Sequence, residues 1–454
     1  MPRFKGLGRA VVVVLGATLV TLATTGGAAK DKVPPDKAFQ KAKKDYQLKA
    51  RSKKPADRIA ALKLLADFPN GEAAEVVYVT LLDDKIDEVR EAAVKSLTAI
   101  CDSSEVTESL LKRMTNSTLK GGMDIRSVGA LQALAGTADE DAQRLILKFL
   151  NEFLGTSSAN LHRLYAMIDE QAAQGEAESV LRMLLLFSQA RYFEANFGFR
   201  RCIVQGIMQV KDQEGIMHLI NLLPRLNGLV QFDVISHLVM ATGENFGDDA
   251  VKWKAWWAKN KGNNQPPEKS EIPPVGNYGN FGDYYGIPIC AKRVVFVLDT
   301  SLSMRGSKID AAKTELIRAI KALPKEVNFD VIAFDNNVRV WQPELVPATE
   351  PLKQVAVNVV IEQPLKLKTA SYDALEAAFS LDPEVIYFLS DGAPFGGKID
   401  DPNEIIRTIS GINRVRRVSI HSIGIGTREA RAAVFGQFMK GLAEANWGIY
   451  KPVN

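Results

Sequence analysis

Two short segments in the last third of the chain, Val294–Leu298 and Val385–Leu389, are apolar at every position. A strand that is apolar on both faces belongs inside a parallel sheet, where helices cover both sides. Further strands are predicted at 329–334 and 418–425, and amphipathic helices at 309–323, 349–362, 372–380, 405–412 and 428–445. Because repeated βα units wind with one hand, residues 289–454 are predicted to form an α/β doubly wound, Rossmann-like domain.

The segment 55–261 is instead predicted to be all-α, because apolar residues recur three and four positions apart along it. Arg58, Arg90 and Arg126 stand in similar local sequences that lie 32 and 36 residues apart. Helix pairs that recur on this scale indicate an α-solenoid, and these local sequences resemble HEAT repeats. The resemblance weakens through 150–240, where a non-repeating helical bundle is the alternative.

A segment rich in proline and glycine separates these two regions. Residues 262–288 hold five prolines and frequent glycine, a composition that favours a semi-extended linker. Aromatic residues in its second half suggest that this half packs on a neighbouring domain. The sequence therefore predicts a multidomain chain, with a HEAT-like solenoid followed by an α/β domain.

The first 29 residues have the pattern of a secretory signal peptide. Basic residues are followed by an apolar stretch at 10–23, and a small-residue segment ends at Ala29, before a charged segment. Cleavage after Ala29 is expected, because the apolar stretch is shorter than a membrane-spanning helix. The alternative is that the segment stays uncleaved and anchors the chain in a membrane. Either way the chain is predicted to be exported, and residues 30–54 are expected to form a basic tether.

Composition argues against several classes of site. Formal net charge is +4, and removal of the basic residues of the signal peptide, Arg3, Lys5 and Arg9, lowers it to +1. This gives no argument for a nucleic-acid partner. Three cysteines, predicted to be buried thiols, cannot form a disulfide framework, and four histidines leave little for a zinc site. Trp253, Trp256 and Trp257, which alternate with lysines, are predicted to lie on a packed helix rather than to stack bases.

Polar residues follow two of the predicted strands of the α/β domain. Asp299, Ser301 and Ser303 come directly after the first strand, and Asp391 comes after the strand at 385–389. Thr369 lies in the intervening segment, just before a predicted helix. In doubly wound sheets, ligands bind beyond the carboxyl ends of the strands. An all-oxygen set of this kind suits a hard cation, Mg²⁺ first, with Mn²⁺ and Ca²⁺ as alternatives.

These five residues, in this order, resemble the metal-ion-dependent adhesion site of von Willebrand factor type A (vWA) domains. The resemblance implies that Ser301 and Ser303 bind the metal directly, and that Thr369 does so in one state. It implies that Asp299 and Asp391 act largely through water, and that an open metal position accepts a carboxylate from a partner. One departure is Leu367-Lys368 before Thr369, where the family often has two glycines.

The resulting prediction is an exported protein, periplasmic, secreted or attached to the cell envelope, that binds other proteins without catalysis. Its partner is expected to offer an exposed Asp or Glu to the bound cation. One alternative is a metal-dependent hydrolase or phosphatase-like enzyme, although no phosphate-binding loop or nucleophile elbow is found. Another is a non-catalytic subunit of an ATP-driven assembly, which the signal peptide argues against.

Overall fold

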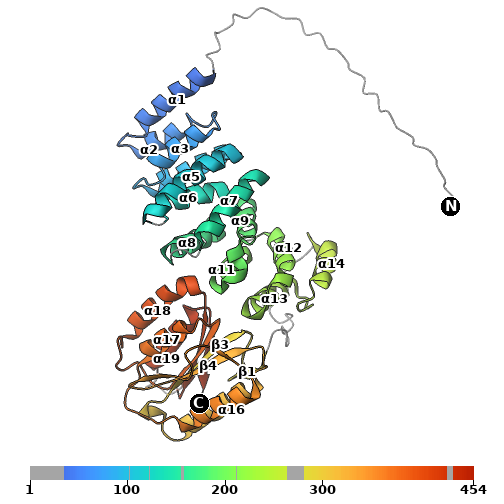
Figure 1. Cartoon of the computed structure of the whole chain (residues 1–454), viewed down its shortest axis with the longest axis vertical. Coiled ribbons are helices and arrows are strands. Elements are labelled where there is room, and N and C mark those ends of the chain that lie inside the picture. The colour runs from blue at the N-terminus through green and yellow to red at the C-terminus, as the bar shows by residue number, and fades with distance from the viewer. Residues whose placement is uncertain are drawn as a thin grey trace, which may run out of the picture.

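The computed structural model describes residues 35–101, 103–121, 123–154, 158–210, 212–262, 281–426 and 433–453. It has a helical region up to residue 262 and an α/β domain from residue 281 (Figure 1). This division confirms the predicted fold class of a helical region followed by a doubly wound sheet. The predicted signal peptide, 1–29, and most of the predicted linker, 263–280, lie outside the described residues.

The helical region is an array in which helices pack against the second helix further along. Contacts of this kind join α2 with α4, α3 with α5, α4 with α6, α5 with α7, α6 with α8 and α7 with α9. Buried apolar residues from neighbouring helices form one continuous cluster. The helices are α1 (Pro35–Lys49), α2 (Pro55–Leu62), α3 (Gly71–Thr80), α4 (Asp87–Ile100), α5 (Ser104–Gly121), α6 (Ile125–Ala135), α7 (Glu140–Phe153), α8 (Ser158–Gln174), α9 (Ala177–Phe187), α10 (Arg191–Ala195), α11 (Phe197–Gln209), α12 (Gln213–Leu222), α13 (Gly228–Thr242) and α14 (Ala250–Asn260).

The three regularly spaced arginines meet at one turn of this array, between α3 and α4. Arg58 donates two hydrogen bonds to the Asp84 carboxylate, at 2.7 and 2.9 Å. Arg90 donates to the Asp84 carbonyl, and Arg126 pairs with Asp83. The regular spacing of the arginines therefore brings all three to the turn at Asp83 and Asp84, and the HEAT-like character of the array stays a prediction.

Part of the segment expected to be a basic tether is a packed helix. In α1, Phe39 and Tyr46 are buried. The Tyr46 hydroxyl bonds with Thr80 on α3, and the Phe39 ring lies 5.5 Å from the Phe68 ring. These two aromatic residues lie on one side of α1, which the array covers, while most of the lysines face water. The structure thus differs from the expectation for 30–54, because the basic residues of α1 share a helix with an apolar face.

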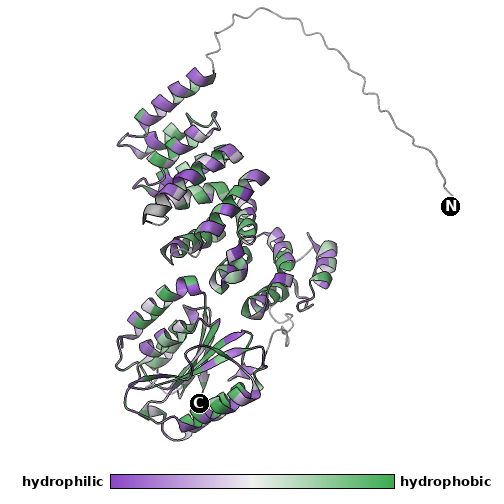
Figure 2. Ribbon diagram, viewed as in Figure 1, coloured by the Kyte–Doolittle hydropathy of each residue, from purple (hydrophilic) through white to green (hydrophobic). Residues whose placement is uncertain are grey.

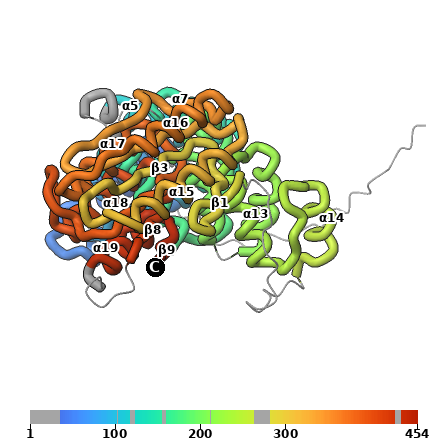
Figure 3. The backbone as a smooth tube through the Cα atoms, turned by 90° about the horizontal axis from the view of Figure 1, so that it is seen from below, coloured from blue at the N-terminus to red at the C-terminus, as the bar shows by residue number. Residues whose placement is uncertain are grey.

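The last helix of the array and the cysteines are as the sequence predicted. Trp253 and Trp257 of α14 are buried, and the Trp253 indole donates to the Gly247 carbonyl at 2.8 Å. Figure 3 shows α14 at one side of the molecule, away from the strands. All three cysteines are buried free thiols, Cys101, Cys202 and Cys290.

The described part of the α/β domain has a seven-stranded sheet in the order β5-β4-β3-β7-β8-β9, with β6 also paired to β4. Pairing is parallel from β4 through β9, and β5 and β6 run antiparallel to β4. Figure 2 shows that the central strands are largely hydrophobic. The strands are β3 (Arg293–Asp299), β4 (Asn328–Phe334), β5 (Val338–Val340), β6 (Val346–Pro347), β7 (Val385–Ser390), β8 (Ser419–Ile425) and β9 (Tyr450–Val453).

Helices cover both faces of this sheet, as the apolar strands require. Alternate residues of β3 point to opposite faces, so that Phe296 packs in one core and Val297 in the other. The first core is closed by α15 (Ser307–Ala322) and α16 (Glu350–Glu362). The second is closed by α17 (Ser371–Ser380), α18 (Pro402–Arg416) and α19 (Ala433–Glu444).

The end of the predicted linker belongs to the α/β domain. The short strands β1 (Asp283–Tyr284) and β2 (Ile287–Pro288) form a hairpin. Tyr284 is buried, with its ring 5.3 Å from Phe296 and 5.8 Å from Tyr387. This agrees with the expectation that the aromatic half packs on a neighbouring domain, and it places the start of the domain before residue 288.

Two buried arginines join the helical region to the α/β domain. Arg417, directly after α18, donates to both carboxylate oxygens of Asp169 on α8, at 2.9 and 2.7 Å, and to Gln205 on α11 at 2.9 Å. Its guanidinium carbon also lies 5.0 Å from the centre of the Trp447 ring. Since Arg417 is only 3% exposed, its charge depends on Asp169 and Gln205 from the helical region.

Arg201 on α11 makes the reciprocal contact. It pairs with Asp233 on α13 at 2.9 Å and donates to the Arg417 carbonyl and, at 3.0 Å, to the Ser419 hydroxyl. Like Arg417, it is 3% exposed. The two domains therefore share a buried polar interface at the beginning of β8, and we expect them to move as one body.

A glycine at this interface allows the close approach of α11 to the end of α18. A Cβ atom added at Gly198 would lie 2.2 Å from the carbonyl oxygen of Val415, which is a backbone atom that cannot rotate away. We predict that Gly198→Ala separates or strains the two domains and costs about 1–3 kcal/mol in the free energy of unfolding. Chemical denaturation measures this cost, and small-angle scattering measures the radius of gyration.

The matched control is Gly411→Ala in the middle of α18, where a Cβ atom would meet nothing within 4 Å. It should be neutral or stabilising by up to ~1 kcal/mol, since alanine favours helix. Equal stability and an equal radius for the two variants would contradict the interface described above.

Candidate metal centre

The register of two neighbouring strands brings distant polar residues together. Leu298 of β3 is paired in register with Leu389 of β7, so Asp299 and Ser390 end the two strands at the same level. Asp391 follows β7, and a short 3-10 helix, Leu302–Met304, follows β3. The carboxyl ends of β3 and β7 therefore present both predicted aspartates on one edge of the sheet.

Hydrogen bonds connect four of the five predicted site residues. The Ser301 amide donates to Asp299 Oδ1 at 2.7 Å. The hydroxyls of Ser301 and Ser303 lie 2.9 Å apart, and the Ser303 hydroxyl donates to Asp391 Oδ1 at 2.7 Å. The oxygen atoms from the two strand ends thus form one continuous group.

Thr369, the fifth predicted residue, lies on a loop that contacts both the segment after β3 and the segment after β7. Lys366 bridges to Ser301 on one side, and its carbonyl accepts from the Leu302 amide at 2.7 Å. On the other side, Thr369 exchanges two backbone hydrogen bonds of 3.0 Å with Phe395. Thr369 itself is 5% exposed. The loop at 366–369 therefore joins the segment after β3 to the segment after β7.

The two carboxylates have different surroundings. Asp299 is fully buried, and this burial raises its pKa to about 7, although hydrogen bonds from Ser390 and Ser301 act in the opposite direction. The Asp391 side chain is also fully covered, and its Oδ2 accepts from the Lys308 ammonium at 2.5 Å. Asp391 therefore has a cationic partner, whereas Asp299 accepts from the Ser390 hydroxyl and the Ser301 amide.

Some residues of this region were not predicted from the sequence. Ser390 donates to Asp299 Oδ2, and Lys308 on α15 pairs with Asp391. The signal for Ser390 was its place directly before Asp391, at the last position of an apolar strand. Lys308 gave no signal, since its distance from Asp391 depends on how α15 packs.

The donors that meet here fit a hard cation. They are carboxylates and hydroxyls, the oxygen ligands that Mg²⁺, Mn²⁺ and Ca²⁺ prefer. Within the ranges that the structure describes, no group of three or more His, Cys, Asp and Glu side chains suited to a metal is found. The site at Asp299 and Asp391 differs from such a group because hydroxyls supply its other ligands.

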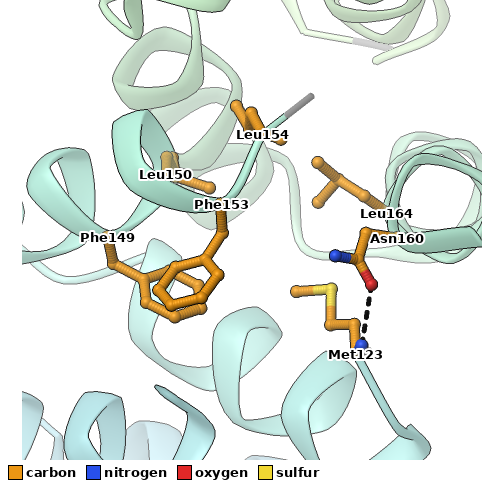
Figure 4. A pocket seen from close by; sticks show the side chains of 7 residues that line it. All are labelled: Met123, Phe149, Leu150, Phe153, Leu154, Asn160 and Leu164. Carbon is orange, nitrogen blue, oxygen red and sulfur yellow. Dashed lines mark hydrogen bonds between the residues drawn. The ribbon is translucent and has the colours of Figure 1, made fainter. Parts of the chain in front are cut away.

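Two hollows lie in the helical region, far from these strand ends. One is an apolar cavity of about 10 Å³, no larger than a single water needs. Figure 4 shows its lining, where the Asn160 side-chain oxygen accepts from the Met123 amide at 2.7 Å. The other, of about 240 Å³, is lined in part by Cys101, Thr137 and Arg182. Neither hollow brings together the residue types predicted for the metal centre.

The family model described as "von Willebrand factor type A domain" matches residues 292–451. Inter-alpha-trypsin inhibitor heavy chain H1 of Mesocricetus auratus is 29% identical over 150 residues, which are 30% of this chain and 16% of that protein. Von Willebrand factor A domain-containing protein 3A of Homo sapiens is 29% identical over 165 residues, 36% of this chain and 13% of that protein. This chain thus spans less than a fifth of the length of either relative.

Among solved structures, an aerotolerance-related membrane protein from Bacteroides fragilis is similar, with 17% identity and a TM-score of 0.28. The match covers 36% of this chain and 90% of that chain. The family model spans the whole sheet from β3 to β8 and the loops that carry the five predicted residues. Residues 292–451 of this chain therefore form a von Willebrand factor type A domain.

Proposed function

We propose that this chain is an exported, non-catalytic protein-binding protein. Its vWA domain holds one divalent cation, Mg²⁺ first, and binds a partner protein through an acidic side chain of that partner. The observation that carries the proposal is the meeting of Asp299, Ser301, Ser303 and Asp391 in one hydrogen-bonded group, with the Thr369 loop beside it.

Each of these residues has a distinct part in the proposal. Ser301, Ser303 and Thr369 would hold the cation through neutral oxygens, so the cation keeps most of its positive charge. Asp299 and Asp391 would act largely through water, so they do not coordinate the cation directly. A cation held in this way attracts a further anionic oxygen, which in a partner protein belongs to Asp or Glu.

A protein-binding role is supported by the family of the domain and by the helical array. The likeness of residues 292–451 to vWA domains favours binding over catalysis. The helices from α1 to α14 offer a second, metal-independent surface, which we propose to be HEAT-like. Magnesium-dependent release of phosphate from a simple aryl phosphate would instead support the hydrolase alternative.

Export is proposed from the first 29 residues alone. Among the described residues, no helix has both the length and the apolar character needed to cross a bilayer. We predict that the exported protein begins at Lys30, which N-terminal sequencing measures. An intact terminus at Met1 or Pro2 would contradict cleavage and favour an anchor.

The metal site is tested with two buried aspartates of the same domain. We predict that Mg²⁺ or Mn²⁺ binds the full chain at one site, and that Asp299→Asn weakens this binding by at least about tenfold, since it removes a carboxylate charge. Isothermal titration calorimetry measures both affinities. The matched control is Asp330→Asn on β4, because Asp330 is also fully buried with a pKa raised by burial to about 7.

Asp330 accepts hydrogen bonds from the backbone amides of Val331 and Gln342, outside the group at Asp299. Its replacement should leave metal affinity unchanged, whereas equal affinities in wild type and Asp299→Asn would remove the site. Both variants should stay folded, since asparagine has nearly the size of aspartate and the apolar residues that fill the two cores of the sheet are unchanged.

The partner bridge is tested by removing the neutral ligands. The wild-type protein should retain partner proteins from an extract in Mg²⁺ and release them in chelator. We predict that the double variant Ser301→Ala/Ser303→Ala does not retain these proteins in Mg²⁺. The reason is that alanine offers the cation no oxygen. Retention of the same proteins in chelator would show that the carboxylate–metal bridge is wrong.

A further inference from the structure

Two large apolar side chains are exposed beside the candidate metal centre. Leu367 is 74% exposed and Phe395 is 62% exposed. Transfer of such a side chain from water to an apolar contact is favourable. Two of them next to one site are therefore a feature of the surface that a partner can use.

Backbone pairing fixes both side chains at the rim of this centre. Leu367 lies between Lys366, which is bridged to Ser301, and Thr369, which is bridged to Phe395. Phe395 thus lies directly beside Thr369, and Leu367 is two positions before Thr369 in the sequence. The two apolar side chains belong to the loops that carry the predicted metal ligands, rather than to a distant patch.

The same rim carries positive charge. Lys308 pairs with Asp391, yet its side chain is 39% exposed. Lys368 is exposed and lies along the backbone at Gly396, since an added Cβ atom there would be 2.8 Å from the Lys368 Cδ and 3.5 Å from its Nζ. An acidic segment is therefore complementary in charge to this rim, even apart from a bound cation.

From these observations we propose that the rim selects partner segments in which an Asp or Glu has an aliphatic or aromatic neighbour within two residues. The acidic side chain is taken by the metal centre and the apolar neighbour packs on Leu367 and Phe395. Here we rely on the proposed function for the metal, and we add the apolar half of the recognised sequence. Leu367 stands where vWA domains often have a glycine, so its side chain adds apolar surface that a glycine would not offer.

The test is a selection of displayed random 12-residue peptides on the purified full chain in Mg²⁺. Recovered peptides should carry an acidic residue with an apolar neighbour. Fluorescence anisotropy of a recovered peptide should then show at least about tenfold weaker binding to Leu367→Ser/Phe395→Ser, since apolar contact area is lost. The matched control is Val355→Ser/Ile361→Ser on α16, whose side chains are 47% and 54% exposed. It should bind like wild type.

Several outcomes would overturn the proposal. They are recovered peptides without apolar enrichment, equal binding to both double variants, or no recovered peptide at all. A magnesium-dependent self-association that only the rim variant loses would assign the surface to a second copy instead. The proposed function is judged separately: peptides that need the rim but bind equally in chelator would support this inference and reject the metal bridge.

Discussion

The parallel pairing of β3 with β4 and β7 is the constraint on which the rest of the α/β domain depends. These strands are buried on both faces, so the chain must cross the sheet through helices and return in the same direction. Their carboxyl ends then lie together on one edge of the sheet. Because the strands themselves are apolar, the polar side chains of the candidate site lie at the strand ends and in the segments that follow them. Asp299 and Asp391, 92 positions apart in sequence, become neighbours for this reason.

The joint between the domains rests on a different kind of contact. Arg201 and Arg417 are almost fully covered, and each depends on oxygen atoms supplied across the interface. Removal of one partner would leave a buried charge without compensation, which is costly. The close approach at Gly198 adds a steric requirement. The helical array and the sheet are therefore held in one arrangement, despite the proline-rich sequence that separates them.

The sequence predicted those parts of the structure that depend on local pattern. The apolar runs at 294–298 and 385–389 lie within β3 and β7, and the predicted helices of the sheet domain lie close to their observed positions. What it missed depends on distant contacts. The role of Arg417 requires Asp169, which lies 248 residues earlier, and Lys308 becomes relevant only when α15 packs beside Asp391. Four of the five candidate ligands meet, whereas metal binding itself stays a prediction.

The docking of the helical array has a mechanical consequence. The array contacts the amino ends of the strands, at Ser419 on β8, while the candidate metal centre lies at the carboxyl ends, at Asp299 and Asp391. A strand of seven residues separates these two levels by ~20 Å. Tension between a partner at the centre and the helical array would therefore run along the strands. Their ladder of hydrogen bonds would be loaded in shear, many bonds at once, rather than opened one bond after another.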